Sequence, residues 1–451
     1  GLGDVYKRQA VGLLIGTILN WYIVSARLRK YTIVAGNSLT IPSFFKNRYR
    51  DHKNIIKIVS ASIIAVFFTV YTASAFSSGA KLFATLFSDS ASGDENYNRV
   101  YVIGLIVAAV VILVYTFMGG FKAVCTTDLI QGLMMIVAIL TVPVLAYAIL
   151  TFDTSFSSAL AAKGVEQPAQ FLNFFVNGDG TPVSAVSIIS NLAWGLGYFG
   201  MPHILVRFMA VKSNEEIKKS RKIAVVWVII SLTASCLIGL IARGYLTAQL
   251  DDATSESVFI RTIQQIFSGN GVLIFIGGIF LCGILAAIMS TADSQLLVTA
   301  SAVSEDLYKG AVKKNASEKS SLLVGKIAVA VVAVIAFFIA LNPKSSIMGL
   351  VSDAWAGFGS AFGPVVLLAL FWKRSTLSGA ISGMATGALT VIIWDYIPLV
   401  NGQTLYAATN LYSLVVGFGL ALIVNVIVSL LSKKPSKEIM DEFDSIKNIE
   451  V

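Results

Sequence analysis

The chain has 451 residues, of which 56% are hydrophobic and only 13% carry a charge. A soluble protein of this length needs far more charged surface, so the composition excludes an ordinary soluble enzyme and indicates a protein that crosses a membrane many times. Two histidines and three cysteines argue against a zinc or catalytic metal cluster, and basic loops rather than nucleic-acid binding account for the net charge of +9.

The first nine residues, GLGDVYKRQ, differ in character from the rest of the chain. They lack an initiator methionine, do not form a signal peptide, and join abruptly to an apolar segment that begins near Ala10. We interpret residues 1–9 as a non-native artefact that resembles a translated sequencing adapter. The chain is therefore expected to be a fragment without its natural start.

Eleven apolar segments come next, each long enough to cross a bilayer as a helix. In chain order they cover residues 10–26, 57–85, 100–118, 128–150, 186–206, 223–246, 271–302, 323–341, 347–371, 377–397 and 410–431. The pattern predicts an all-α polytopic membrane protein.

The charges of the connecting loops alternate along the chain. The loop after the first segment is rich in Lys and Arg, whereas the next loop carries Asp94 and Glu95. Basic loops stay in the cytoplasm, so the alternation predicts an external start and a cytoplasmic tail over residues 432–451. The tail is expected to be a solvated helix or disordered.

The fourth apolar segment begins with polar residues, and the ninth is rich in glycine. Asp128 and Gln131 open the fourth segment, where Thr126 or Thr127 would cap the helix and an acid would interact favourably with its dipole. We favour this capping role over ion handling. The ninth segment contains DAWAGFGSAFGP, which predicts either close helix contact or a flexible span and specifies no ligand by itself.

The fifth apolar segment, NLAWGLGYFGMPHILVRFM at residues 191–209, predicts a broken helix. Three glycines precede Pro202, which would interrupt a continuous helix in the membrane. Transporters bind solutes at such breaks. Trp194 and Tyr198 are four residues apart and share a helix face, so they would either wall an apolar ring substrate or pack ordinarily.

The seventh apolar segment contains a stripe of small residues at helical spacing. Its members are Gly283, Ala287, Ser290, Ser294, Ser301 and Ser304. The stripe predicts close helix packing. Alternatively, the adjacent hydroxyls of Ser290 and Thr291 beside a main-chain carbonyl would provide neutral oxygen ligands for Na⁺. Asp293 is either functional, because a carboxylate inside a membrane is costly, or close enough to the cytoplasmic end to be hydrated.

Three stretches resemble the sodium:solute symporter family in consistent order: GLGYFGMPHILVRFMA, AAIMSTADSQLLVTASAVSEDLYK and AWAGFGSAFGPVVL. The similarity is strongest to its bacterial sodium/proline members and extends from Ala10 to the tail. It implies a LeuT-type inverted-repeat fold with about eleven of thirteen transmembrane helices present. Residues 10–150 would form an incomplete first repeat, 186–371 the second repeat, and 377–431 two extra helices. It also implies a multi-pass protein of the bacterial cell membrane.

The resemblance also implies roles for individual residues. The family's sodium-binding positions fall on Ala287, through its carbonyl, Ser290 and Thr291. Its substrate-binding positions are Trp194, Tyr198 and Pro202. Met201 stands where well-known proline carriers have Gln, and no role is carried over to Asp293. Because the family's first two helices would be absent, each site would be incomplete, and the fragment alone is not expected to transport.

The function implied by the resemblance is Na⁺-coupled uptake of L-proline by alternating access. Na⁺ would be the coupling ion, with no organic cofactor, and the partners would be a small solute and the lipid bilayer, with no nucleic acid. Two alternatives stay open: a symporter of the same family for pantothenate, a sugar or another amino acid, and a symporter-like membrane sensor. An enzyme is not expected, because the sequence offers no paired nucleophile and base.

Overall fold

The computed structural model describes residues 2–88, 94–118, 121–165, 167–168, 171, 173–177, 180–251, 254–313, 315–342 and 346–446. Two parts of the predicted segments lie outside the described residues: Gly1 of the predicted artefact and residues 447–451 of the predicted tail. Nearly all regular structure in the described part is helical. A short antiparallel pair, β1 (Pro398–Val400) and β2 (Gln403–Thr404), joins α15 to α16.

The helices of the first half of the chain are α1 (Leu2–Leu19), the π-helix η1 (Asn20–Val24), α2 (Ser25–Val34), α3 (Ile41–Arg48), α4 (Ile55–Phe87), α5 (Glu95–Met118), α6 (Phe121–Asp153) and α7 (Phe156–Ala162). A broken segment follows, consisting of α8 (Ala185–Leu192), the 3₁₀-helix η3 (Ala193–Phe199) and α9 (Pro202–Ala210). The next helices are α10 (Asn214–Tyr245), the 3₁₀-helix η4 (Ser255–Ser257), α11 (Val258–Ile266), α12 (Gly271–Ser301) and the π-helix η5 (Ala302–Val312). The last are α13 (Glu318–Ala340), α14 (Ile347–Phe371), α15 (Leu377–Tyr396), α16 (Leu405–Thr409), α17 (Ser413–Leu431) and α18 (Lys437–Ser445).

Ten helical segments of the described residues are long and apolar enough to cross a membrane. Together with the broken segment they correspond to the eleven apolar segments predicted from the sequence. Most boundaries agree to within a few residues, and α14 has the predicted bounds. The first span is longer than predicted, because it continues through η1 to Val34.

Side-chain caps fix several helix starts. The side chain of Asn270 accepts from the backbone N–H of Leu273 at the start of α12, and Ser346 does the same for Gly349 at the start of α14. Such caps satisfy N–H groups that the helix itself leaves without partners. They explain why long apolar helices begin at these polar residues.

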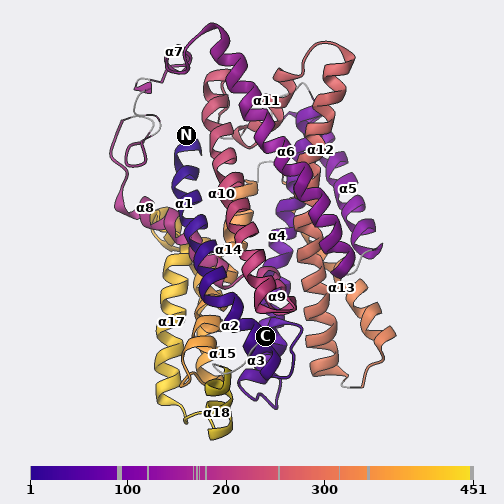
Figure 1. The fold of residues 1–451 in the computed structure, drawn as a ribbon, viewed down its shortest axis with the longest axis vertical. Helices are drawn as coiled ribbons and strands as arrows, with labels where there is room; N and C mark the ends of the chain where they lie inside the picture. Colours follow the sequence, from indigo (N-terminus) through magenta and orange to yellow (C-terminus); the bar gives the residue numbers. More distant parts are fainter. Residues whose placement is uncertain are drawn as a thin grey trace.

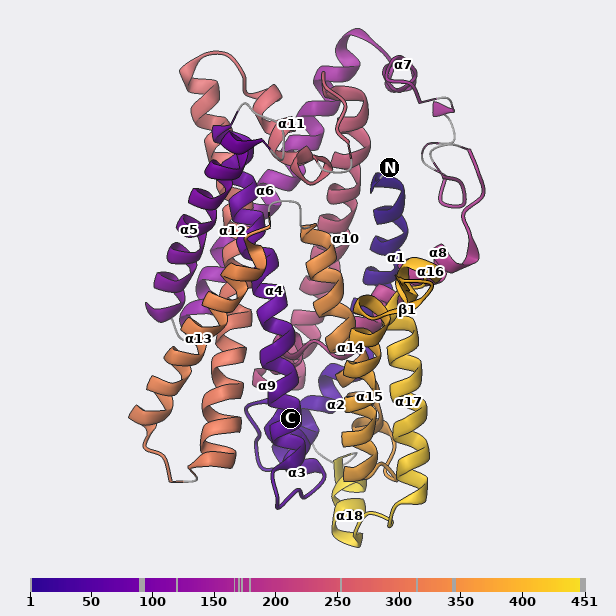
Figure 2. The same cartoon turned by 180° about the vertical axis from the view of Figure 1, so that it is seen from behind.

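The long helices form an elongated bundle with two different ends. In Figure 1 the start of α1 lies towards the upper end, together with α7 and α11, while α3, α18 and the C-terminal end lie at the lower end. The view from behind in Figure 2 shows the same separation. The lower end carries the basic loop between α2 and α4, which is the loop predicted to be cytoplasmic.

Helix α14 lies at the centre of the bundle, since 83% of its most apolar window is buried. Glycines allow this close packing. A Cβ added at Gly359 would come within 2.9 Å of the Cα of Gly197 in η3, and one added at Gly16 of α1 would come within 2.2 Å of the carbonyl oxygen of Gly195. The close helix contact predicted for the ninth segment is therefore confirmed, and α1 and α14 both hold the broken segment.

Both ends of the chain make contacts with other parts of the protein. Residues 2–9 continue α1, and Lys7 and Arg8 donate to the carbonyls of Asn173 and Phe174 at 2.6 and 2.7 Å. The non-native origin of residues 1–9 stays a prediction. The tail forms the expected helix, α18, but the helix is not fully solvated, because Phe443 is 6% exposed and packs against the basic end of the bundle.

Candidate ion and solute site

The broken segment is held by side chains from other helices. Trp355 of α14 donates its Nε1–H to the carbonyl of Trp194 at 2.8 Å, and Asn20 of η1 donates to the carbonyl of Tyr198 at 3.0 Å. Met201 has extended dihedrals, with φ −76° and ψ 108°, and Pro202 opens α9. The predicted break is therefore confirmed, and cross-helix hydrogen bonds anchor its main chain.

Aromatic rings surround the break. The Trp194 ring stacks between Tyr412, at 5.2 Å between centroids, and Trp355, at 6.1 Å. Tyr198 meets Trp355 edge-on at 5.1 Å. Only 8% of Trp194 is exposed. The two predicted aromatic residues therefore belong to one aromatic cluster, with Trp355 in contact with both.

On α12 the three predicted sodium-binding residues lie together. Ser290 donates its hydroxyl to the carbonyl of Ala287 at 3.2 Å, and Thr291 donates to the same carbonyl at 2.9 Å. All three residues are half-buried. One carbonyl and two hydroxyl oxygens thus face one another on a single turn, bonded back onto their own helix.

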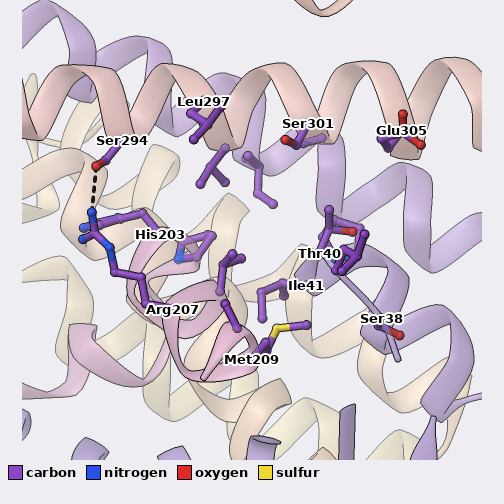
Figure 3. A pocket seen from close by; sticks show the side chains of 18 of the residues that line it. Ser38, Thr40, Ile41, His203, Arg207, Met209, Ser294, Leu297, Ser301 and Glu305 are labelled. Carbon is purple, nitrogen blue, oxygen red and sulfur yellow. Dashed lines mark hydrogen bonds between the residues drawn. The ribbon is translucent and has the colours of Figure 1, made fainter. Parts of the chain in front are cut away.

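A cavity of about 540 Å³ runs beside α12 towards the basic end of the bundle. Figure 3 shows Ser294 and Arg207 at one end of it and Ser38, Thr40 and Glu305 at the other. Of the predicted site residues, Pro202 lines this cavity. Trp194, Tyr198, Ala287, Ser290 and Thr291 are not among its lining residues.

The small-residue stripe of α12 has two roles along its length. Ser294 and Ser301 line the cavity. The ends of the stripe pack against other helices: a Cβ at Gly283 would come within 2.8 Å of Ala138 on α6, and Ser304 lies against Gly325 of α13. The packing interpretation is thus confirmed at the two ends of the stripe, whereas the sodium-ligand interpretation of Ser290 and Thr291 stays a prediction.

A polar triad near the C-terminal end of the broken segment was not predicted. Arg207 of α9 donates to Asp128 of α6 at 2.6 Å and to Ser294 of α12 at 2.9 Å, and Ser294 donates to Asp128 at 3.4 Å. The predicted helix start, with Thr126 or Thr127 as the cap and Asp128 in the first turn, is wrong, because α6 already begins at Phe121 and these residues lie within it. The available signal was an acid within an apolar helix, which usually marks function.

Asp293 lies one residue away from the triad but has a different environment. Its side chain has no exposed surface. It is not among the residues that line the cavity. The interpretation of Asp293 as a hydrated residue near the cytoplasmic end is therefore wrong.

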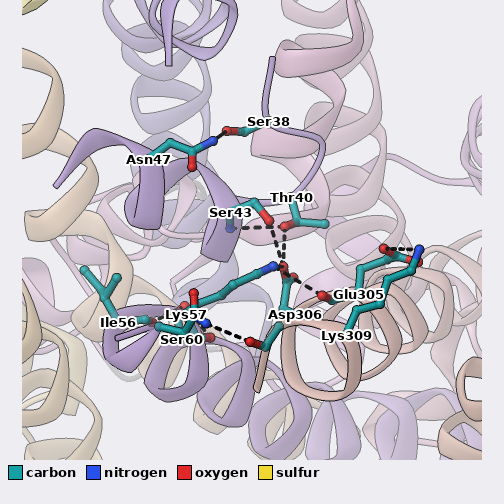
Figure 4. Close-up of polar contacts among 12 residues, drawn as sticks. Ser38, Thr40, Ser43, Asn47, Ile56, Lys57, Ser60, Glu305, Asp306 and Lys309 are labelled. Carbon is teal, nitrogen blue, oxygen red and sulfur yellow. Dashed lines mark hydrogen bonds and ion pairs between the residues drawn. The ribbon is translucent and has the colours of Figure 1, made fainter. Parts of the chain in front are cut away.

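We call the end of the cavity lined by Ser38, Thr40 and Glu305 its mouth. Beside this mouth, Asp306 joins three elements. It pairs with Lys57 at the start of α4 at 3.1 Å and accepts hydrogen bonds from Thr40 at 3.0 Å and Ser43 at 2.8 Å (Figure 4). Asp306 is fully buried and sits within η5, a π-helix, which is a rare conformation often found at functional sites. The network fixes the loop before α3, which forms one wall of the mouth.

At the opposite end, Glu256 of η4 makes a comparable cross-link. It pairs with Lys81 of α4 at 2.6 Å and accepts from the hydroxyl of Ser346 at 3.0 Å and the N–H of Met348 at 3.1 Å. Burial opposes ionisation of Glu256, but the hydrogen bonds from Lys81 and Met348 outweigh it and lower the pKa of the carboxyl. Polar contacts thus join α4, η4 and α14 at the end remote from the cavity mouth.

Comparisons with known proteins agree with this architecture. The model of the sodium:solute symporter family matches residues 3–387. The sodium/proline symporter of Staphylococcus aureus is 41% identical over 447 residues, which cover 97% of this chain and 82% of that protein. Its counterpart from strain JH9 has the same identity, with 81% of that protein covered.

A solved structure is similar over most of its length. The substrate-bound, outward-open structure of a Na⁺-coupled sialic acid symporter has a TM-score of 0.64 and 17% sequence identity, with 96% of this chain and 91% of that chain covered. At this identity the likeness concerns the fold alone. It confirms the all-α class predicted from the apolar segments and the LeuT-type symporter fold that the family resemblance implied.

Proposed function

Because the chain belongs to the sodium:solute symporter family, we propose that it carries L-proline into the bacterial cell together with Na⁺ by alternating access. The chain is a multi-pass membrane transporter and not an enzyme, and Na⁺ is its coupling ion. Proline as the solute is supported by the 41% identity to the S. aureus sodium/proline symporter.

The proposed sodium ligands are the carbonyl of Ala287 and the hydroxyls of Ser290 and Thr291. Their support is the convergence of both hydroxyls on one carbonyl, at 3.2 and 2.9 Å. Neutral oxygens on one helix turn suit a monovalent cation, because they replace hydration water without a buried carboxylate. On binding, the hydroxyls would keep their oxygens turned towards the ion in place of donating to Ala287.

The proposed solute site lies at the broken segment, and the observation that carries it is the aromatic cluster at the break. Proline has an apolar ring, which suits contact with the Trp194 and Tyr198 side chains, and a zwitterionic end, which suits the main-chain groups of an interrupted helix. Pro202 connects this region to the cavity that opens towards the basic end.

Met201 gives a reason to consider a second solute. This side chain is fully buried at the break. The well-known proline carriers that the sequence resembles have Gln at this position. The thioether of Met201 cannot replace the hydrogen bonds of a Gln side chain, so this position supports proline less well than the rest of the segment and keeps another amino acid, a sugar or pantothenate as the second candidate.

We also propose that the α3 and α18 end is cytoplasmic, so that the cavity opens inwards. The support is the basic loop between α2 and α4 at that end and the positive-inside rule. The family resemblance supports residues 10–150 as the incomplete first repeat, 186–371 as the second, inverted repeat, and 377–431 as the two additional helices. The repeats would move against each other during transport.

The driving force suffices for strong accumulation. For one Na⁺, a membrane potential of 100 mV supplies about 2.3 kcal/mol. A tenfold Na⁺ gradient adds about 1.4 kcal/mol, and the sum corresponds to a solute ratio of roughly five-hundred-fold.

The test is uptake of labelled proline by the full-length protein in sealed vesicles with an inward Na⁺ gradient. We expect accumulation that disappears when Na⁺ is replaced by choline and that unlabelled proline competes best within a panel of amino acids, pantothenate and sugars. Stronger competition by another solute would reassign the substrate. Equal uptake in choline would refute sodium coupling.

A further inference from the structure

Trp355 of α14 contacts the broken segment in three ways. Its Nε1–H donates to the carbonyl of Trp194 at 2.8 Å, its ring stacks on that of Trp194, and it meets the Tyr198 ring edge-on at 5.1 Å. The side chain is 6% exposed, and none of the predicted roles involved it. A single residue of the central helix therefore touches both aromatic residues proposed to bind the solute.

The contact between Trp355 and η3 leaves the indole little room to move relative to the η3 backbone. A Cβ added at Gly197, between the two aromatic residues, would come within 2.0 Å of the Trp355 Nε1, so the backbone of η3 lies directly on the indole. Tyr412 of α17 stacks on Trp194 at 5.2 Å. Movement of Trp355 would consequently move Trp194 and Tyr198 as well.

The hydrogen bond ties η3 to another helix. In a regular helix, main-chain carbonyls accept from their own helix, and a donor from a neighbouring helix in an apolar environment adds a directional restraint. Ring stacking alone tolerates sliding, whereas a bond from Nε1 to the Trp194 carbonyl fixes the position of the main chain as well.

We propose that Trp355 is a positioning residue for solute recognition, whose N–H holds the main chain of η3 and whose ring orients Trp194 and Tyr198 towards the ring of a small cyclic amino acid. The proposal rests on the proposed function, in that Trp194 and Tyr198 bind the solute. Trp355 itself acts through them and does not contact the solute.

The test is the variant Trp355→Phe, which keeps an aromatic ring and removes the donor. We expect the KM for proline to rise about tenfold, the effect of one lost buried hydrogen bond. The kcat and the half-saturating Na⁺ concentration, measured at saturating proline, should stay within about twofold, because the proposed ion ligands lie on α12.

The matched control is Tyr101→Phe. The Tyr101 hydroxyl also donates to a main-chain carbonyl of another helix, Ala340 of α13 at 2.8 Å, and it too is buried. The substitution likewise keeps a ring and removes a donor, but far from the broken segment. It should leave the KM for proline unchanged, and an equal rise would mean that any lost cross-helix bond has this effect.

Two further outcomes separate this inference from the proposed function. If Trp194→Ala raises the KM for proline and Trp355→Phe does not, the positioning role is refuted and the solute site stands. If Trp194→Ala leaves proline binding unchanged, the solute site itself is refuted. The double variant should be less than additive, because both residues act on the same contact.

A second variant covers failure of Trp355→Phe to fold. Gly197→Ala would push on the indole from the other side and should raise the KM for proline without changing the half-saturating Na⁺ concentration. An equal rise in both quantities for either folded variant would indicate general distortion and overturn the proposal.

Discussion

The broken segment and α12 satisfy their main-chain polar groups in opposite ways. At the break, other helices provide the donors: Trp355 for the carbonyl of Trp194 and Asn20 for that of Tyr198. On α12, Ser290 and Thr291 donate to a carbonyl of their own helix. The proposed solute site thus depends on contacts between helices, whereas the three proposed ion ligands lie within one turn.

This difference has a consequence for function. Ligands within one turn keep their mutual geometry when the helix moves as a rigid body. A site built between helices changes whenever those helices move relative to each other. In alternating access, the solute site is therefore the one that helix movement can disrupt directly.

The largest effect is expected where a between-helix contact is both buried and charged. Lys57→Met leaves the buried Asp306 carboxylate without its cation, and we expect a loss of about 3–5 kcal/mol of unfolding free energy. The within-helix pair Lys309–Glu305 is more exposed, with 29% and 47% of the side chains accessible. Lys309→Met should cost less than about 1 kcal/mol. Denaturant unfolding of both variants in detergent measures the two changes in unfolding free energy. Equal changes would contradict the expected difference between the buried and the exposed pair.

The next largest effect concerns solute recognition. Trp194→Ala removes a ring that stacks between two others and should raise the KM for proline by about 10- to 100-fold. Trp194→Phe keeps an aromatic face and should lie between wild type and Ala. Uptake kinetics at saturating Na⁺ provide the measurement, and a Phe variant as impaired as Ala would argue against an aromatic contact with the solute.

A smaller and more selective effect is expected on α12. Thr291→Ala removes one proposed ion ligand and should raise the half-saturating Na⁺ concentration about tenfold. Thr299→Ala is the control, because Thr299 makes the same kind of bond to its own helix, to the carbonyl of Gln295 at 2.8 Å. If both variants raise the half-saturating Na⁺ concentration equally, the effect comes from losing a within-helix hydrogen bond, and Thr291 is not supported as an ion ligand.

The smallest effect is a pH dependence at the end remote from the cavity mouth. The pKa of Glu256 is lowered from its ordinary value of 4.5, since its bonds to Lys81 and Met348 outweigh its burial. A lowered pKa stabilises the folded state at pH values above the unfolded value, and this stabilisation disappears as the pH falls through the folded value. Thermal unfolding between pH 6 and pH 3 should therefore be less pH-dependent in Glu256→Gln, and an identical slope would exclude this contribution.

Local features of the sequence predicted most of the fold. Apolar runs gave the spans because hydrophobic length is a local property, and glycines before Pro202 predicted the break. The proximity of Ala287, Ser290 and Thr291 followed from helical spacing alone. The family resemblance, not spacing, suggested their roles, which stay predictions.

Contacts between distant residues were not predictable from one sequence. Arg207 and Asp128 are 79 residues apart, and Trp355 and Trp194 are 161 apart. The predicted cap at Thr126 or Thr127 is wrong because α6 begins at Phe121, several residues before the polar start of the apolar run. The packing of Phe443 was missed because a charged tail gave no sign of the aromatic and cationic surface that it covers.

Coupling between the two ligands is the central claim, and equilibrium binding tests it without a gradient. Labelled proline is titrated against the purified full-length protein in Na⁺ and in choline, and Na⁺ is titrated with and without proline. Saturating Na⁺ should lower the Kd for proline by about tenfold or more, and proline should tighten Na⁺ binding by the same factor, because coupling is reciprocal. Equal proline affinity in Na⁺ and in choline would contradict the account.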